Sequence, residues 1–259
     1  MKYDFSGKTL LVTGAASGIG KTAAIEFAKN GAFVAAADIL EPSETGVAFT
    51  EFGNAIAAFK CDIADEQQVE AFVAEVVNSF GKIDFAFNCA GIGPDGVRYP
   101  YSPLTDTDGE VWQKMFDINL TGTFFLLKYE LRQMQKQGFG SIVNVGSTGG
   151  YRFPPTFHAY APTKAGVVAL TELASNENAR LGIRINAVCP GPTGDTQLFI
   201  NSSSYDKGSE EHIKEHLIPT GNINTKQDVI EAVMWLCSDA ARQVTGQSLF
   251  VDGGMHARP

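Results

Sequence analysis

Seven short apolar runs recur along the chain, separated by stretches that carry helical periodicity. The runs are almost continuously hydrophobic rather than alternating, which is typical of parallel strands buried on both faces. They lie at residues 8–13, 32–38, 55–61, 83–88, 141–146, 183–188 and 247–251. Strands that alternate with helices need right-handed crossovers and build a doubly wound α/β sheet. Because no linker, repeat or low-complexity tract interrupts this pattern, we predict a single domain over residues 1–259.

The clearest helix is expected at 65–80. Asp65 can cap its first turn, apolar residues then repeat at helical spacing, and Gly81 can end it. The longest irregular stretch is 190–224, which is rich in Pro, Gly, Ser and Asn. A connection of that length inside a compact fold is usually functional or mobile.

Charge and cysteine usage exclude several classes of protein. A net charge of −9 argues against a nucleic-acid surface, which needs clustered Lys and Arg. No basic run suits an anionic membrane, and no apolar stretch reaches the ~18–20 residues that span a bilayer. The four cysteines are scattered without CxxC spacing, and the first residues lead straight into a strand-like run. We therefore expect free thiols and a cytoplasmic protein without nucleic-acid or membrane partners.

A glycine-rich turn, TGAASGIG at residues 13–20, follows the first strand run and opens the first helix. Gly14, Gly18 and Gly20 would let the backbone turn sharply and approach a pyrophosphate, which the helix N-terminus attracts. The second strand run ends in Asp38, whose carboxylate could accept both ribose hydroxyls and would repel a 2′-phosphate. This pattern favours NAD(H) over NADP(H). The other interpretation of Asp38 is a capping residue before ILEPSE.

Read together, these motifs resemble the short-chain dehydrogenase/reductase family. The glycine turn is joined by NCAG at 88–91, GS at 146–147, a YxxxK pattern at 160–164 and VDGG at 251–254. The resemblance covers essentially the whole chain. It implies a seven-stranded parallel sheet in the order 3-2-1-4-5-6-7, with helices on both faces and a substrate lid at about 193–224.

The resemblance also implies a catalytic tetrad. Tyr160 matches the family's general acid–base, and Lys164, one helical turn on, could lower its pKa together with an oxidised nicotinamide. Ser147 matches the serine that orients the substrate oxygen. Asn119 matches an asparagine in a locally opened helix that supports a proton relay.

Further cofactor contacts carry over from the same resemblance. They lie in the glycine turn, after the second, third and fourth strands, in the YxxxK pair, and in PGPT at 190–193. The full set is Gly14, Ser17, Gly18, Ile19, Gly20, Asp38, Ile39, Asp62, Ile63, Asn88, Ala90, Gly91, Tyr160, Lys164, Pro190, Gly191 and Thr193. Cys89 stands where many members have a second asparagine, and we interpret it as a small buried filler.

Pro162 lies between the two members of the YxxxK pair, where the family usually has a small residue. Proline is tolerated only in the first turn of a helix, whose amides have no intrahelical partner. We therefore predict that this helix begins no earlier than Ala159, with Tyr160 and Lys164 on one face.

These observations predict an NAD-dependent enzyme that interconverts a secondary alcohol and a ketone without a metal. Aromatic residues suggest an apolar cleft for a bulky substrate, such as a hydroxysteroid or a cyclic or aryl alcohol. They are Tyr99, Tyr101, Tyr151, Phe153 and Phe157, with Leu198 and Phe199 from the lid. Arg98 or Arg152 could instead bind a carboxylate or a CoA phosphate, as in a 3-oxoacyl reductase. The remaining alternative is a cofactor-binding sensor without turnover.

Two further features bear on metal binding and assembly. The pair His212 and His216 in HIKEH has zinc-ligand spacing, but no third ligand is evident, so we expect no metal. The segment 116–131 is apolar on more than one face, and in the family the matching helices form a subunit interface. We expect a homo-oligomer, either a dimer or a tetramer.

Overall fold

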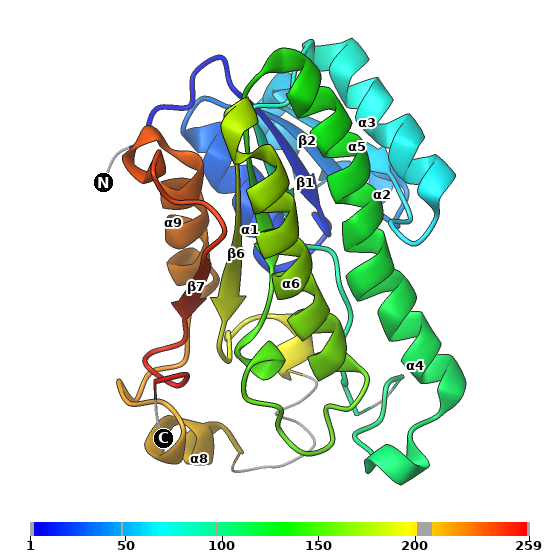
Figure 1. Cartoon of the computed structure of the whole chain (residues 1–259), viewed down its shortest axis with the longest axis vertical. Helices are drawn as coiled ribbons and strands as arrows, with labels where there is room; N and C mark the ends of the chain where they lie inside the picture. The colour runs from blue at the N-terminus through cyan, green and yellow to red at the C-terminus, as the bar shows by residue number, and fades with distance from the viewer. Residues whose placement is uncertain (1–2, 48, 97, 201–208, 258–259) are drawn as a thin grey trace.

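One seven-stranded parallel sheet forms the centre of the protein (Figure 1). The computed structural model describes residues 3–47, 49–96, 98–200 and 209–257. The strand order is β3-β2-β1-β4-β5-β6-β7, and every neighbouring pair is parallel. The strands are β1 (Thr9–Thr13), β2 (Phe33–Asp38), β3 (Ile56–Lys60), β4 (Phe85–Asn88), β5 (Gly140–Val145), β6 (Ile183–Pro190) and β7 (Ser248–Val251). The predicted strand runs, the parallel sheet and its order are confirmed.

Helices cover both faces of this sheet. One face carries α1 (Gly18–Lys29) and α9 (Lys226–Cys237), and the other carries α3 (Glu66–Phe80), α5 (Gly122–Gln137) and α6 (Tyr160–Asn178). The remaining α-helices are α2 (Pro42–Val47), α4 (Gly109–Met115) and α8 (Ser209–His216). A π-helical segment, η3 (Phe116–Thr121), joins α4 to α5. Short 3-10 turns are η1 (Thr50–Ala55), η2 (Leu104–Asp106), η4 (Thr148–Gly150), η5 (Ala179–Leu181) and η6 (Asp239–Ala241).

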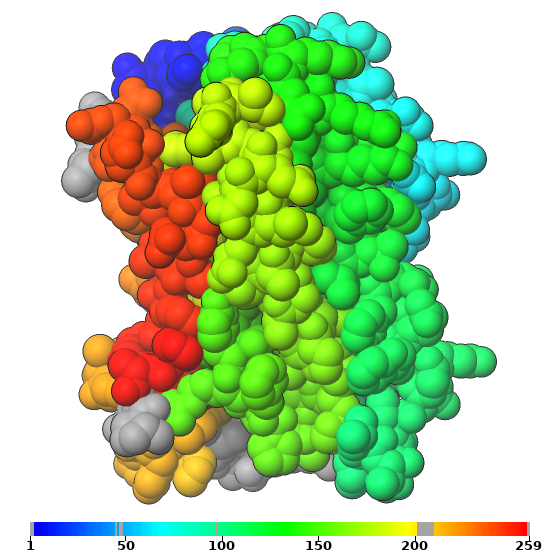
Figure 2. Space-filling view, in the orientation of Figure 1, coloured from blue at the N-terminus to red at the C-terminus, as the bar shows by residue number. Residues whose placement is uncertain are grey.

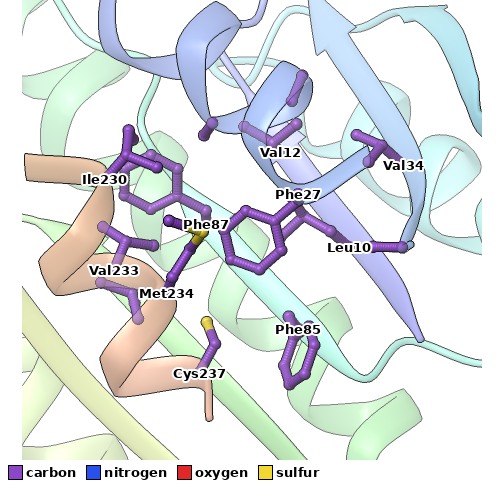
Figure 3. Close-up of a cluster of buried hydrophobic side chains, with 14 of the residues drawn as sticks. Leu10, Val12, Phe27, Val34, Phe85, Phe87, Ile230, Val233, Met234 and Cys237 are labelled. Carbon is purple, nitrogen blue, oxygen red and sulfur yellow. The ribbon is translucent and has the colours of Figure 1, made fainter. Parts of the chain in front are cut away.

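Two apolar cores follow from the alternation of side chains along the strands. Leu10 and Val12 of β1 face α1 and α9, while Leu11 between them faces the opposite helices, and all three are completely buried. Figure 3 shows Phe27 of α1 and Phe87 of β4 packed in the first of these cores. Strands buried on both faces explain why their sequences are continuously apolar.

The helix predicted at 65–80 is α3, and its ends have the expected chemistry. The carboxylate of Asp65 accepts hydrogen bonds from the amides of Gln67 and Gln68, at 2.9 and 3.2 Å. Gly81 ends the helix in the left-handed region at φ 80°. Local sequence signals alone therefore determine both ends of this element.

The carboxyl ends of the strands share one edge of the sheet, the lower edge in Figure 1, near α4 and α8. In doubly wound folds, ligands bind at this edge, outside the carboxyl ends of the strands. Part of the stretch predicted as a lid, 193–224, lies here, with Thr193 bridged to Asn224 and α8 between them. Its residues 201–208 lie outside the described part of the chain. No helix among the described residues is both long and apolar enough to cross a membrane.

Candidate active site

The glycine turn has a geometry that only glycine supports. Gly14 and Gly18 adopt positive φ angles of 69° and 56°. A Cβ on Gly14 would lie 2.9 Å from the Cα of Ala90, and a Cβ on Gly20 would lie 2.3 Å from the carbonyl oxygen of Gly14. The turn is thus pressed against the end of β4 on one side and folded onto α1 on the other. Near Gly18, by contrast, a Thr196 methyl carbon at 4.0 Å is the one atom of the described residues that comes within 4 Å of the Cβ position.

Asp38 ends β2 directly beside this turn. Its Oδ2 accepts a hydrogen bond from the amide of Ala16 at 2.9 Å, and its Oδ1 accepts one from the amide of Leu40 at 3.3 Å. The carboxylate is half-buried and fixed in position by these two bonds. Lys60 stands next to Asp38 in the β3 register, but its ammonium group is paired with Glu41. The local charge around Asp38 is therefore negative.

Tyr160 is the first residue of α6, and Ala159 is the residue before the helix. Pro162 consequently falls in the first turn, where the missing amide costs little. The Nζ of Lys164 lies 5.7 Å from the centre of the Tyr160 ring, so both side chains occupy one face of the helix. The prediction for the start of this helix is confirmed.

Burial dominates the electrostatics of this pair. It raises the pKa of Tyr160 above its ordinary value, against an opposing hydrogen bond with the Ser147 side chain. Burial also lowers the pKa of Lys164 to about 8. The Lys164 ammonium donates to the carbonyl oxygen of Val145 at 2.9 Å and lies beside the tyrosine ring. The protein's own groups thus raise the pKa of Tyr160; the lowering expected from Lys164 remains a prediction for the complex with an oxidised nicotinamide.

Ser147 follows β5 and caps the short turn η4. Its Oγ accepts a hydrogen bond from the amide of Gly149 at 3.0 Å. A Cβ on Gly149 would lie 3.3 Å from this Oγ and 3.6 Å from Cε1 of Tyr160, so the serine and the tyrosine border the same small space. Because the Tyr160 hydroxyl also forms a hydrogen bond with the Ser147 side chain, an oxygen atom beside this pair could contact both hydroxyl groups.

Asn119 lies in the π-helical segment and is completely buried. Its Oδ1 accepts from the amide of Ile92 at 2.8 Å, while its Nδ2 donates to the Ile92 carbonyl at 2.8 Å and to the Thr163 hydroxyl at 3.2 Å. The expected local opening of the helix is therefore present. The side chain clamps the loop after β4 onto α6, and a π-bulge of this kind is frequent at functional sites.

Comparison with known proteins agrees with this arrangement. A family model described as enoyl-(acyl carrier protein) reductase matches residues 14–256. The 2,5-dichloro-2,5-cyclohexadiene-1,4-diol dehydrogenase of Sphingobium indicum is 39% identical over 255 residues, which are 98% of this chain and 99% of the relative. The chain belongs to the short-chain dehydrogenase/reductase family. Members of this family are oxidoreductases that use nicotinamide cofactors.

Solved structures of this family bind either nicotinamide cofactor. An NAD⁺-bound xylitol dehydrogenase has a TM-score of 0.89 at 30% identity, over 96% of this chain and 99% of its own. ElxO with NADP bound has a TM-score of 0.89 at 33% identity, over 97% of this chain and 99% of its own. The family therefore establishes a nicotinamide cofactor, and the choice between NAD and NADP rests on this chain's own residues.

The other residues that the family resemblance assigned to the cofactor lie along the same edge. Ile39 is exposed beyond β2, Asp62 accepts from the amide of Ala64, and Ile63 is packed in the core. Pro190 ends β6, and the Thr193 hydroxyl donates to the Gly191 carbonyl at 3.0 Å. Ala90 and Gly91 form the turn against which Gly14 and Asn119 pack, Ser17 precedes α1 without a capping bond, and Ile19 is half-buried in α1.

Asn88 differs from the family-based expectation. Its side chain points away from the cofactor edge, into a buried network where Nδ2 donates to Glu130 Oε2 at 3.0 Å and to Asn144 Oδ1 at 2.9 Å. We therefore expect the main chain after Asn88, and not the Asn88 side chain, to contact a cofactor. Glu130 itself was missed, because the segment 116–131 was interpreted as an apolar helix. A lone carboxylate on a buried face of such a helix is the signal that could have identified it.

The predicted aromatic lining is partly present. The ring of Phe157 lies 5.5 Å from that of Tyr101 and 5.9 Å from that of Tyr160, and all three rings adjoin the reaction centre. Leu198 also reaches this space, since a Cβ on Gly93 would contact both Leu198 and Tyr160. Tyr151 is not part of the lining, because its hydroxyl bonds Ser248 and its ring packs on Phe250.

A pocket lies next to Tyr160, where the loop after β4 meets the segment before α6. It is lined by Pro94, Pro100, Ser102, Asp106, Thr107, Asp108, Val111, Met115, Thr156, Phe157, His158, Ala159 and Tyr160. His158 is one of these lining residues. Thr156 has a positive φ of 71°, which is strained for a β-branched residue.

The histidine pair of the HIKEH segment lies on α8. The rings of His212 and His216 stack with centroids 4.5 Å apart. Among the described residues, no group of three or more His, Cys, Asp or Glu side chains is placed to hold a metal ion. All four cysteines are free.

Proposed function

We propose that the protein is an NAD(H)-dependent oxidoreductase that interconverts a secondary alcohol and a ketone. The observation that carries this proposal is the convergence of Ser147, Tyr160 and Lys164 at the carboxyl end of the sheet. Lys164 lies near Gly91, which follows the residue on which the glycine turn packs, Ala90. Such a set can bind an alcohol oxygen, move its proton and hold a charge beside it.

The dinucleotide would supply or accept the hydride at its nicotinamide ring. In the alcohol-oxidising direction, the Ser147 hydroxyl orients the substrate oxygen, and Tyr160 removes its proton. A phenol is ordinarily too weak an acid for this task near neutral pH. Lys164 supplies positive charge at the ring of Tyr160, and Asn119 holds the adjoining loop in place through Ile92.

The glycine turn fits a dinucleotide pyrophosphate. Gly14 and Gly20 leave no room for a side chain, while no atom of the described residues comes closer than 4.0 Å to the Cβ position of Gly18. The N-terminus of α1 lies there, and its partial positive charge favours a phosphate. Ser17 makes no capping bond to this helix, which leaves its hydroxyl group available to a phosphate oxygen.

Asp38 supports NAD(H) rather than NADP(H). A 2′-phosphate on the adenosine ribose would approach a fixed carboxylate, and the neighbouring Lys60 is already paired with Glu41. Like charges brought together in this way cost several kcal/mol. We therefore expect kcat/KM for NAD⁺ to exceed that for NADP⁺ on the order of 10²-fold.

The apolar surface beside Tyr160 supports a bulky, largely apolar alcohol. Tyr101, Phe157 and Leu198 place apolar surface beside Tyr160. The Sphingobium relative is named for a cyclic diol, and a ring of that kind suits this surface. The 3-oxoacyl alternative is weaker because Arg98 is paired with Asp95 and Arg152 donates to the carbonyl of Met255.

Initial rates with a panel of cyclic, aryl and steroid alcohols test this proposal, each measured with NAD⁺ and with NADP⁺. We expect turnover with NAD⁺ on at least one cyclic secondary alcohol. Replacing Asp38 with serine should narrow the difference between the cofactors, because the repelling carboxylate is gone. Binding of NADH without turnover of any alcohol or ketone would instead indicate the sensor alternative.

A further inference from the structure

Glu130 of α5 is a completely buried carboxyl group. No cation lies within salt-bridge distance of it in the part of the chain that the structure describes. Within the described ranges, the hydrogen bond that Glu130 makes comes from Asn88, whose Nδ2 donates to Oε2 at 3.0 Å. A charged carboxylate in such surroundings would be strongly unfavourable.

Two oxygen atoms of this pair lack a partner. Among the described residues, neither Oε1 of Glu130 nor Oδ1 of Asn88 makes a hydrogen bond, although both are buried. The two hydrogens of Asn88 Nδ2 go to Glu130 and to Asn144, and Asn144 in turn donates to the hydroxyl of Thr171 at 2.9 Å. The network therefore has donors for every acceptor except these two oxygens.

A single proton on Glu130 would give both of these oxygen atoms a hydrogen-bond partner. An ionised carboxylate only accepts hydrogen bonds, so it cannot donate one to the Asn88 Oδ1 atom. A neutral carboxyl group has one O–H donor. With the proton on Oε1, Glu130 can donate to Oδ1 of Asn88 while Oε2 accepts from Nδ2, which closes a cyclic acid–amide pair.

We propose that Glu130 is a neutral carboxylic acid paired with the Asn88 side chain, and that this pair is a positioning element of the dinucleotide site. The inference rests on the proposed function for the identity of the ligand. Asn88 is the last residue of β4, and the next two amides, of Cys89 and Ala90, both donate to the Thr13 hydroxyl at 3.2 Å. Gly14 packs on Ala90 at that point. Fixing Asn88 therefore fixes the junction between the β4 turn and the glycine turn.

The surroundings of Glu130 agree with a neutral acid. Burial raises its pKa to about 7, against the opposing hydrogen bond from Asn88. Among the described residues, no charged group contributes to the raised pKa of Glu130. The charged side chains on the elements that carry or pack against it are Glu66, Glu70 and Glu75 of α3, Asp117 of η3, Lys128, Arg132 and Lys136 of α5, and Lys164, Glu172 and Glu177 of α6.

Infrared difference spectroscopy of wild type against Glu130→Gln tests the protonation directly, with no cofactor present. At about pH 6, below the raised pKa, we expect the carbonyl band of a protonated carboxylic acid, and at about pH 9 we expect this band to be lost. Only a carboxylate band at both pH values would overturn the proposal. Failure of the proposed enzymatic function would leave this band unchanged.

The positioning role is tested by the dissociation constant of NADH, measured by fluorescence titration. Glutamine is close in shape to the neutral acid and, like it, offers one donor group and one acceptor oxygen to Asn88, so Glu130→Gln should bind NADH as wild type does at about pH 6. At about pH 9 wild type should bind more weakly than Glu130→Gln by about fivefold or more, since proton and ligand binding are coupled. The control variant Glu75→Gln lies on the exposed face of α3, so its NADH dissociation constant should match that of wild type at both pH values. A ratio of the two constants that does not change with pH, or no NADH binding by either protein, rejects the positioning role.

Discussion

At the scale of single residues, the reaction centre combines groups whose burial opposes their task. Burial raises the pKa of Tyr160 and lowers that of Lys164 to about 8, so each side chain is pushed toward its neutral form. The identity of both residues could be predicted from the YxxxK spacing. Their protonation could not, because it depends on how deeply the fold buries them. A bound positive charge beside Tyr160, such as an oxidised nicotinamide, is needed to lower the pKa of Tyr160 again.

Glu130 gives a stability prediction at this scale. Its pKa rises from the ordinary value of 4.5 to about 7 in the folded protein. The folded state therefore holds its proton more tightly than the unfolded state does. The stabilisation is complete below pH 4.5 and is lost as the pH rises through about 7. As the pH rises from 4.5 to about 7, the melting temperature of wild type should fall progressively below that of Glu130→Gln. Parallel curves for the two proteins would contradict the prediction.

At the scale of elements, local signals determine some helices and not others. The cap at Asp65 and the stop at Gly81 predict α3 from sequence, because both act on their own helix. Local capping signals do not predict the π-helical segment. It is held by bonds from Asn119 to Ile92 and to Thr163, which are distant in the sequence. The family resemblance implied a local opening there, but its form required the tertiary contacts.

Pro162 provides a prediction for α6. Because it lies in the first turn, Pro162→Ala should change the free energy of unfolding by less than about 1 kcal/mol. The matched control is Ala169→Pro, an exposed position in the middle of the same helix, which should destabilise the protein by about 3 kcal/mol. Urea unfolding of both variants measures these changes. A large loss with Pro162→Ala would mean that the proline shapes the site.

Gly20 provides a prediction for the glycine turn. A Cβ there would lie 2.3 Å from the carbonyl oxygen of Gly14, so Gly20→Ala must displace the turn. A displacement of about 1 Å can cost on the order of 10²-fold at a precise site, and NADH binding should weaken accordingly. Gly109→Ala is the control, since a Cβ there meets no atom of the described residues within 4 Å. Unchanged NADH affinity in Gly20→Ala would place the pyrophosphate elsewhere.

At the scale of the whole molecule, α5 and α6 lie side by side and form a broad face (Figure 2). Phe124 of α5 and Leu173 of α6 are large apolar residues that are 45% and 56% exposed. We propose, from the family resemblance, that these helices form a subunit interface. Leu173→Glu should therefore shift the protein toward a smaller species in light scattering coupled to gel filtration. Wild type that is already monomeric at micromolar concentration would contradict this expectation.

The sheet order and the motif positions could be predicted for the whole chain because the crossover rule and the spacing of the motifs constrain them. The pairing of Asn88 with Glu130 could not. These residues are 42 positions apart and meet only because α5 packs across the end of β4. Buried polar partners of this kind leave no periodic trace in the sequence.

Tyr160→Phe, in a single-turnover reaction with NAD⁺ and an alcohol found active in the panel, tests the central claim most directly. The substitution keeps the ring and its packing but removes the hydroxyl that would accept the substrate proton. NADH formation should slow by about 10²–10⁴-fold, the usual contribution of a general acid–base, while the NADH dissociation constant stays within about twofold of wild type. Formation of NADH by Tyr160→Phe at the wild-type rate would show that another group transfers the proton.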